Sequence, residues 1–338
     1  MVRGTRLRQR LTERVAYSPV LSRLAFRALR SRALGAFPPY RFLLARQIRA
    51  VKARNASFPR VVAAENTNAC NARCAMCPYP AMARPKGVMA MPLYRKIVDE
   101  CALHPGVELR LSGFGEPLLD ADLFARIRYA KEKGIEIVQL TTNASLLDGE
   151  KARGLVDSGI DEVMLSVDGW DRESYARIRV GLDFDRVREN ARGLLCMRGE
   201  GRKPRVVASI ILFDEYASRR GDIIAAWRDC ADRFFVKPPE DWAGQVRRPG
   251  GAALPRRPHI PCPYLWTQFL IAWDGTVGLC CRDFCDIRTP IGSVADRGIA
   301  EVWHGETLAR IREGDARGRT QEVCRGCLYA PNWWGERS

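Results

Sequence analysis

The sequence lacks the features that mark exported or membrane-embedded proteins. No apolar run approaches the roughly 18–20 residues that a helix needs to cross a bilayer. The start, MVRGTRLRQRLTERV, has neither a central apolar stretch nor a small-residue cleavage site, so a secretory signal is not expected. We therefore expect a cytoplasmic protein, whose twelve cysteines should not form disulfides in a reducing compartment. Grouped cysteines in such a protein point to metal instead.

Acidic residues are scarce at the N-terminus. Residues 1–60 hold fourteen arginines and one lysine against the single acid Glu13, which accounts for +14 of the net charge of +16. Apolar residues recur at helical spacing between these arginines, so we expect residues 1–57 to form a basic helical extension. It could lie on an anionic membrane surface, bind an anionic partner, or pack on the protein with its arginines in solvent. No nucleic-acid contact is expected, because no basic stripe with interleaved aromatic residues is evident in the rest of the chain.

Short apolar runs alternate with helical stretches from about residue 58. Such runs suit strands that are buried on both faces of a parallel sheet, and their alternation with helices is typical of an α/β fold. A complete eightfold barrel needs roughly 250 residues, so we expect residues 58–240 to form a partial (β/α)6 TIM-like barrel. The expected strands are 61–65, 107–112, 135–141, 161–167, 205–212 and 232–237, and the expected helices are 92–104, 119–133, 147–158, 183–198 and 218–230.

Three cysteines lie close together after the first expected strand, at the face where α/β barrels carry their active sites. Cys70, Cys74 and Cys77 fall within eight residues, and sulfur ligands select an iron–sulfur cluster or zinc. A [4Fe–4S] cluster needs four ligands, so one iron would stay open to an external chelator. Zinc would require a fourth Cys or His nearby, and the nearest histidine is the distant His104. We expect a cluster, with zinc as the alternative.

The C-x3-C-x2-C spacing of these cysteines resembles the signature of the radical S-adenosylmethionine (SAM) superfamily. The resemblance implies that SAM chelates the open iron and that Met76 contacts its adenine. The string from Ser112 to Leu118, with Gly113, Gly115 and Glu116, resembles the glycine-rich motif of that family that receives the SAM amino group. Further SAM contacts are implied at later strand ends, with ordinary turn or solvated roles as the alternative. The residues at strand ends are Asn143, Ser166 and Asp168, and Arg179 could pair with the SAM carboxylate. The family's adenine-binding motif is not recognisable on the fifth strand.

A second group of cysteines lies within residues 241–338. Asp274-Gly275 between two β-like runs predicts a hairpin, and a helix is expected over 297–313. The segments PCPYLW and WDGTVGLCCRD resemble the SPASM domain and its shortened twitch form, which bind auxiliary [4Fe–4S] clusters. The resemblance implies a small C-terminal domain with one auxiliary cluster. Its implied ligands are Cys262, Cys280, Cys324 and Cys327, and Cys281 could replace Cys280. A structural zinc site is the alternative.

The resemblance also implies the chemistry. An external one-electron reductant of the flavodoxin or ferredoxin type drives cleavage of SAM to a 5′-deoxyadenosyl radical, which removes a hydrogen atom from an unactivated C–H bond. The auxiliary cluster can then accept an electron, giving a net oxidation, or a thiol can return a hydrogen atom, giving epimerisation. Cys281 or Cys285 could be that thiol, and Asp283 could take a hydroxyl proton. Trp242 could line the substrate pocket. Packing and turn roles are the alternatives.

The expected substrate class rests on the lack of a winged-helix pattern in residues 1–57. Many peptide-modifying relatives carry a winged-helix module there, whereas residues 1–57 have helical periodicity and no β alternation. We therefore expect a hydroxylated small molecule, sugar-like or a glycan precursor, with a ribosomal peptide or protein as the alternative. The distant alternative is a zinc-stapled binding module, which would be colourless and would not turn over SAM.

Overall fold

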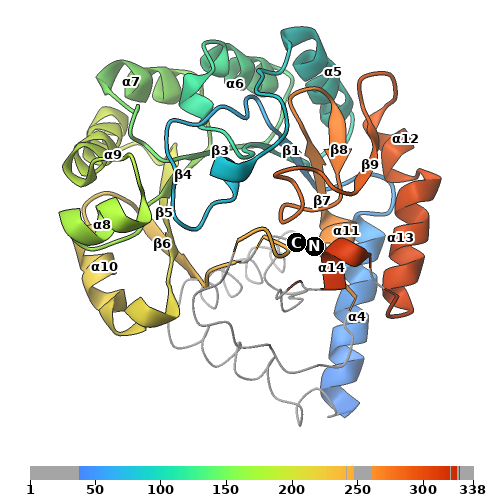
Figure 1. The fold of residues 1–338 in the computed structure, drawn as a ribbon. Helices are drawn as coiled ribbons and strands as arrows, with labels where there is room; N and C mark the ends of the chain where they lie inside the picture. Colours follow the sequence, from blue (N-terminus) through green and yellow to red (C-terminus); the bar gives the residue numbers. More distant parts are fainter. Residues whose placement is uncertain (1–37, 241, 247–260, 320, 326, 328–338) are drawn as a thin grey trace.

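A nine-stranded sheet with the order β6-β5-β4-β3-β2-β1-β7-β8-β9 forms the centre of the molecule. The computed structural model describes residues 38–240, 242–246, 261–319, 321–325 and 327. The first six strands are parallel throughout and curve into an open arch, with helices on its outer side (Figure 1). They are β1 (Val61–Ala64), β2 (Glu108–Leu111), β3 (Ile137–Thr142), β4 (Glu162–Ser166), β5 (Arg205–Ile211) and β6 (Arg233–Lys237). The expected partial barrel is confirmed.

The outer layer contains the expected helices and one more. The helices are α5 (Met91–Ala102), α6 (Leu123–Glu132), α7 (Gly149–Asp157), α8 (Arg172–Ile178), α9 (Phe184–Arg198) and α10 (Arg220–Ala226). The sequence analysis did not predict α8, which a capping box starts: the Asp171 side chain accepts from the backbone N–H of Ser174, and the Ser174 hydroxyl accepts in return. Three 3-10 turns, η1 (Tyr79–Ala81), η2 (Pro117–Leu119) and η3 (Asp214–Arg219), lie in the connections that follow strands.

The core lies between the sheet and this helical layer. Val62, Leu109 and Val163 on neighbouring strands have no exposed side-chain surface. Each such side chain contributes about 1.5–3 kcal/mol relative to an exposed position. The carboxyl ends of the strands, where loops carry polar residues and cysteines, are therefore set on a rigid base.

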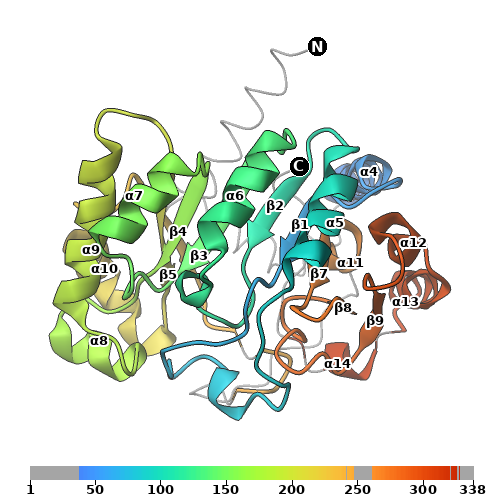
Figure 2. The same ribbon diagram turned by 90° about the horizontal axis from the view of Figure 1, so that it is seen from above.

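The C-terminal residues extend the same sheet. β7 (Gln268–Ile271) pairs in parallel with β1, so that Val61 is opposite Gln268, and β8 (Thr276–Gly278) and β9 (Pro290–Ser293) follow in antiparallel order. The predicted hairpin at Asp274-Gly275 is confirmed, with Gly275 at φ +91°. Figure 2 shows β7–β9 beside the barrel strands and not as a detached unit.

The helix expected over 297–313 is two helices, so its predicted continuity was wrong. α12 (Ile299–Trp303) ends before Gly305, whose ψ of 150° is extended, and α13 (Glu306–Ala316) starts after it. Glycine loses more conformational freedom in a helix than other residues, which favours a break here. Two short helices, α11 (Tyr264–Thr267) and α14 (Glu322–Arg325), complete this part.

The described part of the basic extension is α4 (Pro38–Arg54), which confirms helical structure there; residues 1–37 lie outside the described residues. Val51 of α4 is buried, and Lys52 Nζ lies 4.1 Å from the ring centroid of Trp266 in α11. Trp303 Nε1 donates to the carbonyl of Asn55 at 2.9 Å. The end of α4 therefore packs on the C-terminal half. In the part of the chain that the structure describes, no helix combines the length and the apolar character needed to cross a membrane.

Candidate functional site

The long connection between β1 and α5 carries Cys70, Cys74 and Cys77; we call it the triad loop (residues 65–90). Cys74 is buried and the other two are half-buried. Burial raises the pKa of Cys70 and of Cys77 to about 11; the charges of Glu116 and Cys74 add to the shift at Cys70, and those of Cys74 and Cys70 add to it at Cys77. The structure thus brings the three thiols into one another's electrostatic range. Metal binding here would displace protons, because thiolates are the ligands.

The triad loop is closed on itself by its own side chains. Asn68 Nδ2 donates to the carbonyl of Pro85 at 2.8 Å, and Asn68 Oδ1 accepts from the N–H of Gly87 at 2.8 Å. The hydroxyl of Tyr79 accepts from Cys70 N–H at 2.8 Å and donates to the Cys70 carbonyl at 3.1 Å. These hydrogen bonds join the two halves of the triad loop.

The glycine-rich segment after β2 lies directly on the triad loop. The N–H of Glu116 donates to the carbonyl of Ala69 at 2.7 Å. A Cβ on Gly115 would stand 2.2 Å from the carbonyl oxygen of Thr67, and a Cβ on Gly113 would stand 2.5 Å from Cγ of Glu65. Only glycine permits such close approach, so both glycines are explained by packing as well as by an implied ligand.

We expect Gly115→Ala to lower the free energy of unfolding by about 1–3 kcal/mol, as overpacking does, and to weaken SAM binding. The added methyl group would meet two backbone oxygens, of Thr67 and Ala69, which cannot rotate away. Urea unfolding and equilibrium dialysis with SAM measure the two effects. Gly193→Ala in α9 is the control, because its Cβ meets nothing within 4 Å and alanine favours a helix by about 0.5–1 kcal/mol. Equal stability of the two variants would contradict the prediction.

The Glu116 carboxylate connects the ends of β2 and β3. It is buried and accepts hydrogen bonds from the Thr142 hydroxyl at 2.6 Å and from the N–H of Asn143 at 2.7 Å. Burial raises its pKa, although these hydrogen bonds oppose the shift. Asn143 Nδ2 in turn donates to Oδ1 of Asn71 in the triad loop at 2.9 Å. These contacts give Glu116 a structural role, and its part in receiving the SAM amino group stays a prediction.

Asp168 and Arg179 form a buried pair that reaches the triad. Asp168 is fully buried, and its Oδ2 accepts from Nε and Nη2 of Arg179, both at 2.6 Å. Arg179 Nη1 lies 3.6 Å from Sγ of Cys74. Burial alone would lower the pKa of Arg179, but the charge of Asp168 outweighs it and raises the pKa above its usual value. A fixed positive charge thus lies next to the sulfur of Cys74. Ser166, another expected site residue, lies half-buried at the end of β4.

A cavity of about 140 Å³ opens beside Met76. Ile178, Phe213 and Tyr216 also line it, and the two aromatic rings meet edge to face at 6.1 Å. Phe213 and Tyr216 were not among the site residues expected from the sequence. The available signal was their position just after β5, where loops of an α/β barrel form the active-site face.

Trp242 covers the other side of Met76. Its Nε1 donates to the Met76 carbonyl at 2.7 Å, and its ring lies edge-on to Phe114 with centroids 5.2 Å apart. Trp242 and Ala243 have φ of +51° and +56°, a region that side chains other than glycine rarely occupy. The loop after β6 therefore holds Trp242 between the triad loop and the glycine-rich segment.

Four further cysteines form a second group in the C-terminal half. Burial and the charges of Cys280 and Cys327 raise the pKa of Cys262 well above its usual value. Burial likewise raises the pKa of Cys280 to about 12 and that of Cys324 to about 11, with smaller contributions from neighbouring cysteines. Asp315 Oδ2 fixes Cys262 by accepting from its N–H at 2.8 Å. The structure thus places the four cysteines that the sequence grouped within electrostatic range of their neighbours in the group.

Both groups suit a cluster by the chemistry of their donors, since soft sulfur ligands select iron–sulfur centres or zinc. The triad offers three thiols and the second group offers four. Among the described residues, no three His, Cys, Asp or Glu side chains converge as a site for a single metal ion.

A small apolar cluster lies between the two groups; we call it the inter-loop cluster. It contains Phe114, Phe284 and Cys285, with the partly buried Cys77, Trp242 and Cys281 packed against them. Cys77 belongs to the triad, while Cys281 follows Cys280 of the second group. The two cysteine-bearing loops are therefore direct neighbours in the fold.

Asp283 lies in the loop between Cys280 and Cys285 and is fully buried. Its oxygens accept from Arg288 Nε at 3.1 Å and from the N–H of Thr289 at 2.8 Å. This arrangement favours the turn-holding role over the proton acceptor that the sequence suggested.

Comparison with known proteins agrees with this geometry. The family model described as the Radical SAM superfamily matches residues 65–214, and that of an iron-sulfur cluster-binding domain, SPASM, matches residues 262–328. An AdoMet-dependent heme synthase of Methanosarcina barkeri is 34% identical over 122 residues, 36% of this chain and 34% of that protein. A probable GTP 3′,8-cyclase of Methanococcus maripaludis is 36% identical over 125 residues, 36% of this chain and 41% of that protein. The matches thus span roughly a third to two fifths of these relatives.

Solved structures share the fold at low sequence identity. BtrN in complex with AdoMet and 2-DOIA has a TM-score of 0.60 at 17% identity, over 83% of this chain and 97% of that chain. SuiB of Streptococcus suis bound to the precursor peptide SuiA has a TM-score of 0.65 at 14% identity, over 87% of this chain and 78% of that chain. The cysteine motif, the fold and the matched families agree: residues 65–214 form a domain of the radical SAM superfamily, and residues 262–328 form a C-terminal SPASM iron–sulfur domain.

Proposed function

We propose that this radical SAM enzyme oxidises a hydroxylated carbon of a sugar-like small molecule or glycan precursor to a carbonyl. The observation that carries this proposal is the inter-loop cluster, against which both Cys77 of the triad and Cys281, next to Cys280, pack. A two-electron oxidation needs one group that removes a hydrogen atom from the substrate and a second group that accepts the remaining electron. The triad loop and the loop after Cys280, which would carry these two groups, are neighbours in this fold. In this proposal residues 58–240 hold SAM and its cluster, and residues 241–338 hold the auxiliary cluster.

Each residue of the site then has a physical task. When bound, the two clusters and SAM supply the redox chemistry, one electron for cleavage of SAM and one acceptor for the substrate electron. Cys70, Cys74 and Cys77 hold the first cluster and leave one iron for SAM. Gly113 and Gly115 let the backbone approach the ligand closely. The four remaining ligands are Cys262, Cys280, Cys324 and Cys327.

Other side chains orient the ligand and exclude water. Asp168 holds Arg179 against Cys74, so its positive charge would favour an anionic group of SAM or of a cluster held by the triad. Met76 and Phe213 offer apolar surface to adenine in the cavity. Trp242 and Phe114 cover the space between the cysteine groups, which keeps competing hydrogen donors away. Asn143 and Ser166 remain candidates for ribose contacts at the strand ends.

The proposal of a small-molecule substrate rests on how much of each solved structure the chain aligns with. The chain aligns over 97% of BtrN, which was solved with AdoMet and 2-DOIA, but over 78% of SuiB, which was solved with a precursor peptide. The described part of the N-terminal extension, α4, packs on α11 through Lys52. This packing supports a structural role for α4 over a membrane contact. A peptide substrate is the alternative.

A second candidate reaction is epimerisation, in which a thiol returns a hydrogen atom to the substrate carbon. The specific observation is Cys285, which is fully buried in the inter-loop cluster beside Phe114 and Cys77. Cys281 is half-buried in the same cluster. Either thiol belongs to the C-terminal half and lies in the same cluster as Cys77 of the triad loop.

The experiment is anaerobic reconstitution with SAM and a flavodoxin or ferredoxin type reductant, followed by mass spectrometry of hydroxylated candidate substrates in D2O. We expect products that have lost two hydrogens, together with one deoxyadenosine for each product. Unchanged mass except for one solvent deuterium would select epimerisation instead. Modification of a peptide alone, with no turnover of small molecules, would overturn the substrate class.

A further inference from the structure

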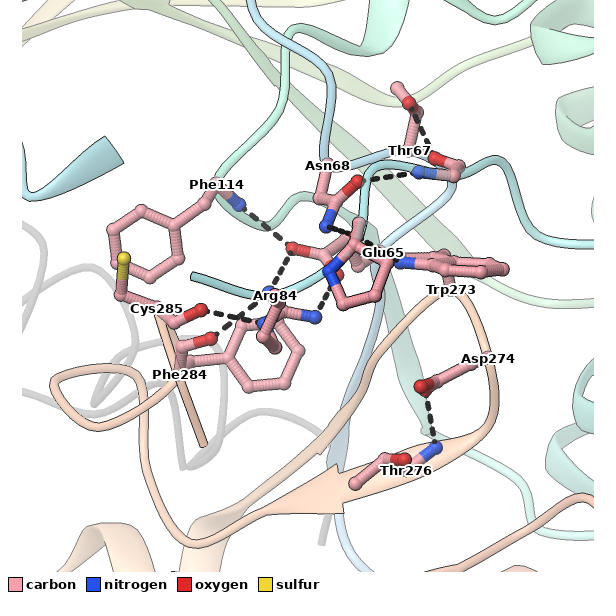
Figure 3. A network of polar contacts seen from close by, with 12 residues as sticks. Glu65, Thr67, Asn68, Arg84, Phe114, Trp273, Asp274, Thr276, Phe284 and Cys285 are labelled. Carbon is pink, nitrogen blue, oxygen red and sulfur yellow. Dashed lines mark hydrogen bonds and ion pairs between the residues drawn. The ribbon is translucent and has the colours of Figure 1, made fainter. Parts of the chain in front are cut away.

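One ion pair stands at the junction of three loops. The guanidinium of Arg84, in the returning half of the triad loop, binds the Glu65 carboxylate with both nitrogens: Nη1 to Oε2 and Nη2 to Oε1, each at 3.0 Å (Figure 3). The Glu65 side chain is fully buried and that of Arg84 is 12% exposed. Two-pronged pairs of this kind fix direction as well as distance.

The remaining donors of Arg84 reach the loop that follows Cys280 and Cys281. Arg84 Nε donates to the carbonyl of Cys285 at 2.6 Å, and Nη2 also donates to the carbonyl of Phe284 at 3.1 Å. The neighbouring N–H of Ala83 donates to Oδ1 of Asp286 at 2.8 Å. One short segment of the triad loop is therefore bonded directly to residues 284–286, which we call the auxiliary loop.

Glu65 extends the same network to the glycine-rich segment. Its Oε1 accepts from the N–H of Phe114 at 3.1 Å, and its side chain fills the place where Gly113 has no Cβ. Phe114 is a member of the inter-loop cluster, and its ring lies beside Cys285 in Figure 3. Glu65 and Arg84 thus bond to the triad loop, the glycine-rich segment and the auxiliary loop at once.

A second contact holds the same segment in place. Trp273, in the β7–β8 hairpin, donates from Nε1 to the carbonyl of Pro85 at 3.2 Å, and its ring occupies the space beside Gly87. The triad loop is therefore anchored to the C-terminal half from two directions. Arg84 is the charged member of that anchor, and neither it nor Glu65 is needed as a cluster ligand.

We propose that Glu65 and Arg84 are positioning residues that set the spacing and orientation of the auxiliary loop relative to the triad loop. This inference rests on the proposed function, because it assigns these loops to the two ends of one reaction. Loss of the pair leaves both cysteine groups intact but lets the loops shift. A misplacement of about 1 Å can cost on the order of 100-fold in rate, so SAM cleavage becomes uncoupled from substrate oxidation.

The test uses Arg84→Lys in the full-length, reconstituted enzyme. Lysine keeps a positive charge beside Glu65 but cannot donate to both carboxylate oxygens and both carbonyls. Arg205→Lys is the matched control, because Arg205 also donates to a buried glutamate, Glu162, at the start of the strands and away from the cysteines. We expect Arg84→Lys to retain iron and deoxyadenosine formation. The amount of product per deoxyadenosine should fall at least ~10-fold, which is less than the loss on the order of 100-fold that a misplacement of about 1 Å can cause.

A structural measurement separates this inference from the proposed function. The magnetic interaction between the two reduced clusters, measured by pulsed EPR, should change in Arg84→Lys and remain unchanged in Arg205→Lys. If Arg84→Lys folds poorly, the double variant Glu65→Gln/Arg84→Met takes its place. It removes both charges together and should show the same change in the magnetic interaction. An unchanged interaction in the Arg84 variants would overturn the inference. If wild type forms no oxidised product while the interaction changes as expected, the proposed substrate oxidation is wrong and the positioning role stands.

Discussion

Cys70→Ala is expected to abolish deoxyadenosine formation from SAM. The half-buried Cys70 is one of three sulfurs in the triad loop, and a cluster that already lacks a fourth protein ligand is not held by two. The variant should lose about four of roughly eight irons, because each cubane contains four. Iron analysis and chromatography of the SAM products after anaerobic reconstitution measure both effects.

The control is Cys196→Ala in α9, whose cysteine is exposed and lies outside both groups. It should retain wild-type iron content and SAM cleavage. Cys324→Ala should lose a similar amount of iron while keeping its triad signal, since Cys324 belongs to the second group. Full SAM cleavage by Cys70→Ala would show that the triad does not hold the SAM-binding cluster.

The second large effect is expected from Asp168→Ala, which should lower the free energy of unfolding by about 3–5 kcal/mol, as removal of one partner of a buried ion pair does. Arg179 would keep its charge in a site where its side chain is only 10% exposed, with Cys74 Sγ 3.6 Å away. Asp168 also accepts from the N–H of Ile211 at 2.5 Å, so the end of β5 would lose its partner. Urea unfolding followed by circular dichroism measures the change.

Two further variants separate the charge from the packing. Asp168→Ala/Arg179→Met removes both charges and should recover part of the lost stability, because no unpaired charge stays buried. Asp185→Ala breaks the exposed pair with Arg172 and should leave the transition unchanged within error, as surface pairs do. A transition of Asp168→Ala that coincides with that of Asp185→Ala would contradict the assignment of a buried, structurally necessary pair.

The barrel and the cysteine groups were predictable because local signals specify them. The strands of a parallel sheet are short apolar runs, and Val206–Ile210 in β5 is such a run. The triad spacing is contained in eight residues, and so is the glycine-rich segment. The family resemblance implied SAM contacts at Asn143 and Asp168, and the carboxyl ends of parallel strands meet at one edge, so both were expected near the triad without knowledge of side-chain contacts.

Side-chain directions were not predictable in the same way. Glu116 and Asp168 are at the expected strand ends, but their carboxylates bind Thr142 and Arg179 and thereby brace the site. Nothing in the sequence indicates which way a carboxylate at a strand end turns. The pairing of Glu65 with Arg84 escaped notice because both lie in a loop without periodicity, and Phe284, whose carbonyl accepts from Arg84, is 200 residues away along the chain.

The sequence patterns also could not predict which distant segments of the chain pair with one another. The hairpin at Asp274-Gly275 was visible, but not that β7 joins the barrel sheet next to β1. Short segments carry weak signals too: α8 has seven residues and was missed, although its capping box at Asp171 could have marked its start. Such long-range pairings determine how near the second cysteine group lies to the first.

The most direct test of the SAM site is the EPR spectrum of the reduced, reconstituted protein before and after addition of SAM. Three sulfurs from one loop leave one iron without a protein ligand, so SAM should change the spectrum of one [4Fe–4S] cluster and leave that of the other unchanged. SAM labelled with 17O in its carboxylate should broaden the first signal only. A protein that shows no cubane signal, or a spectrum that SAM does not alter, would contradict the site.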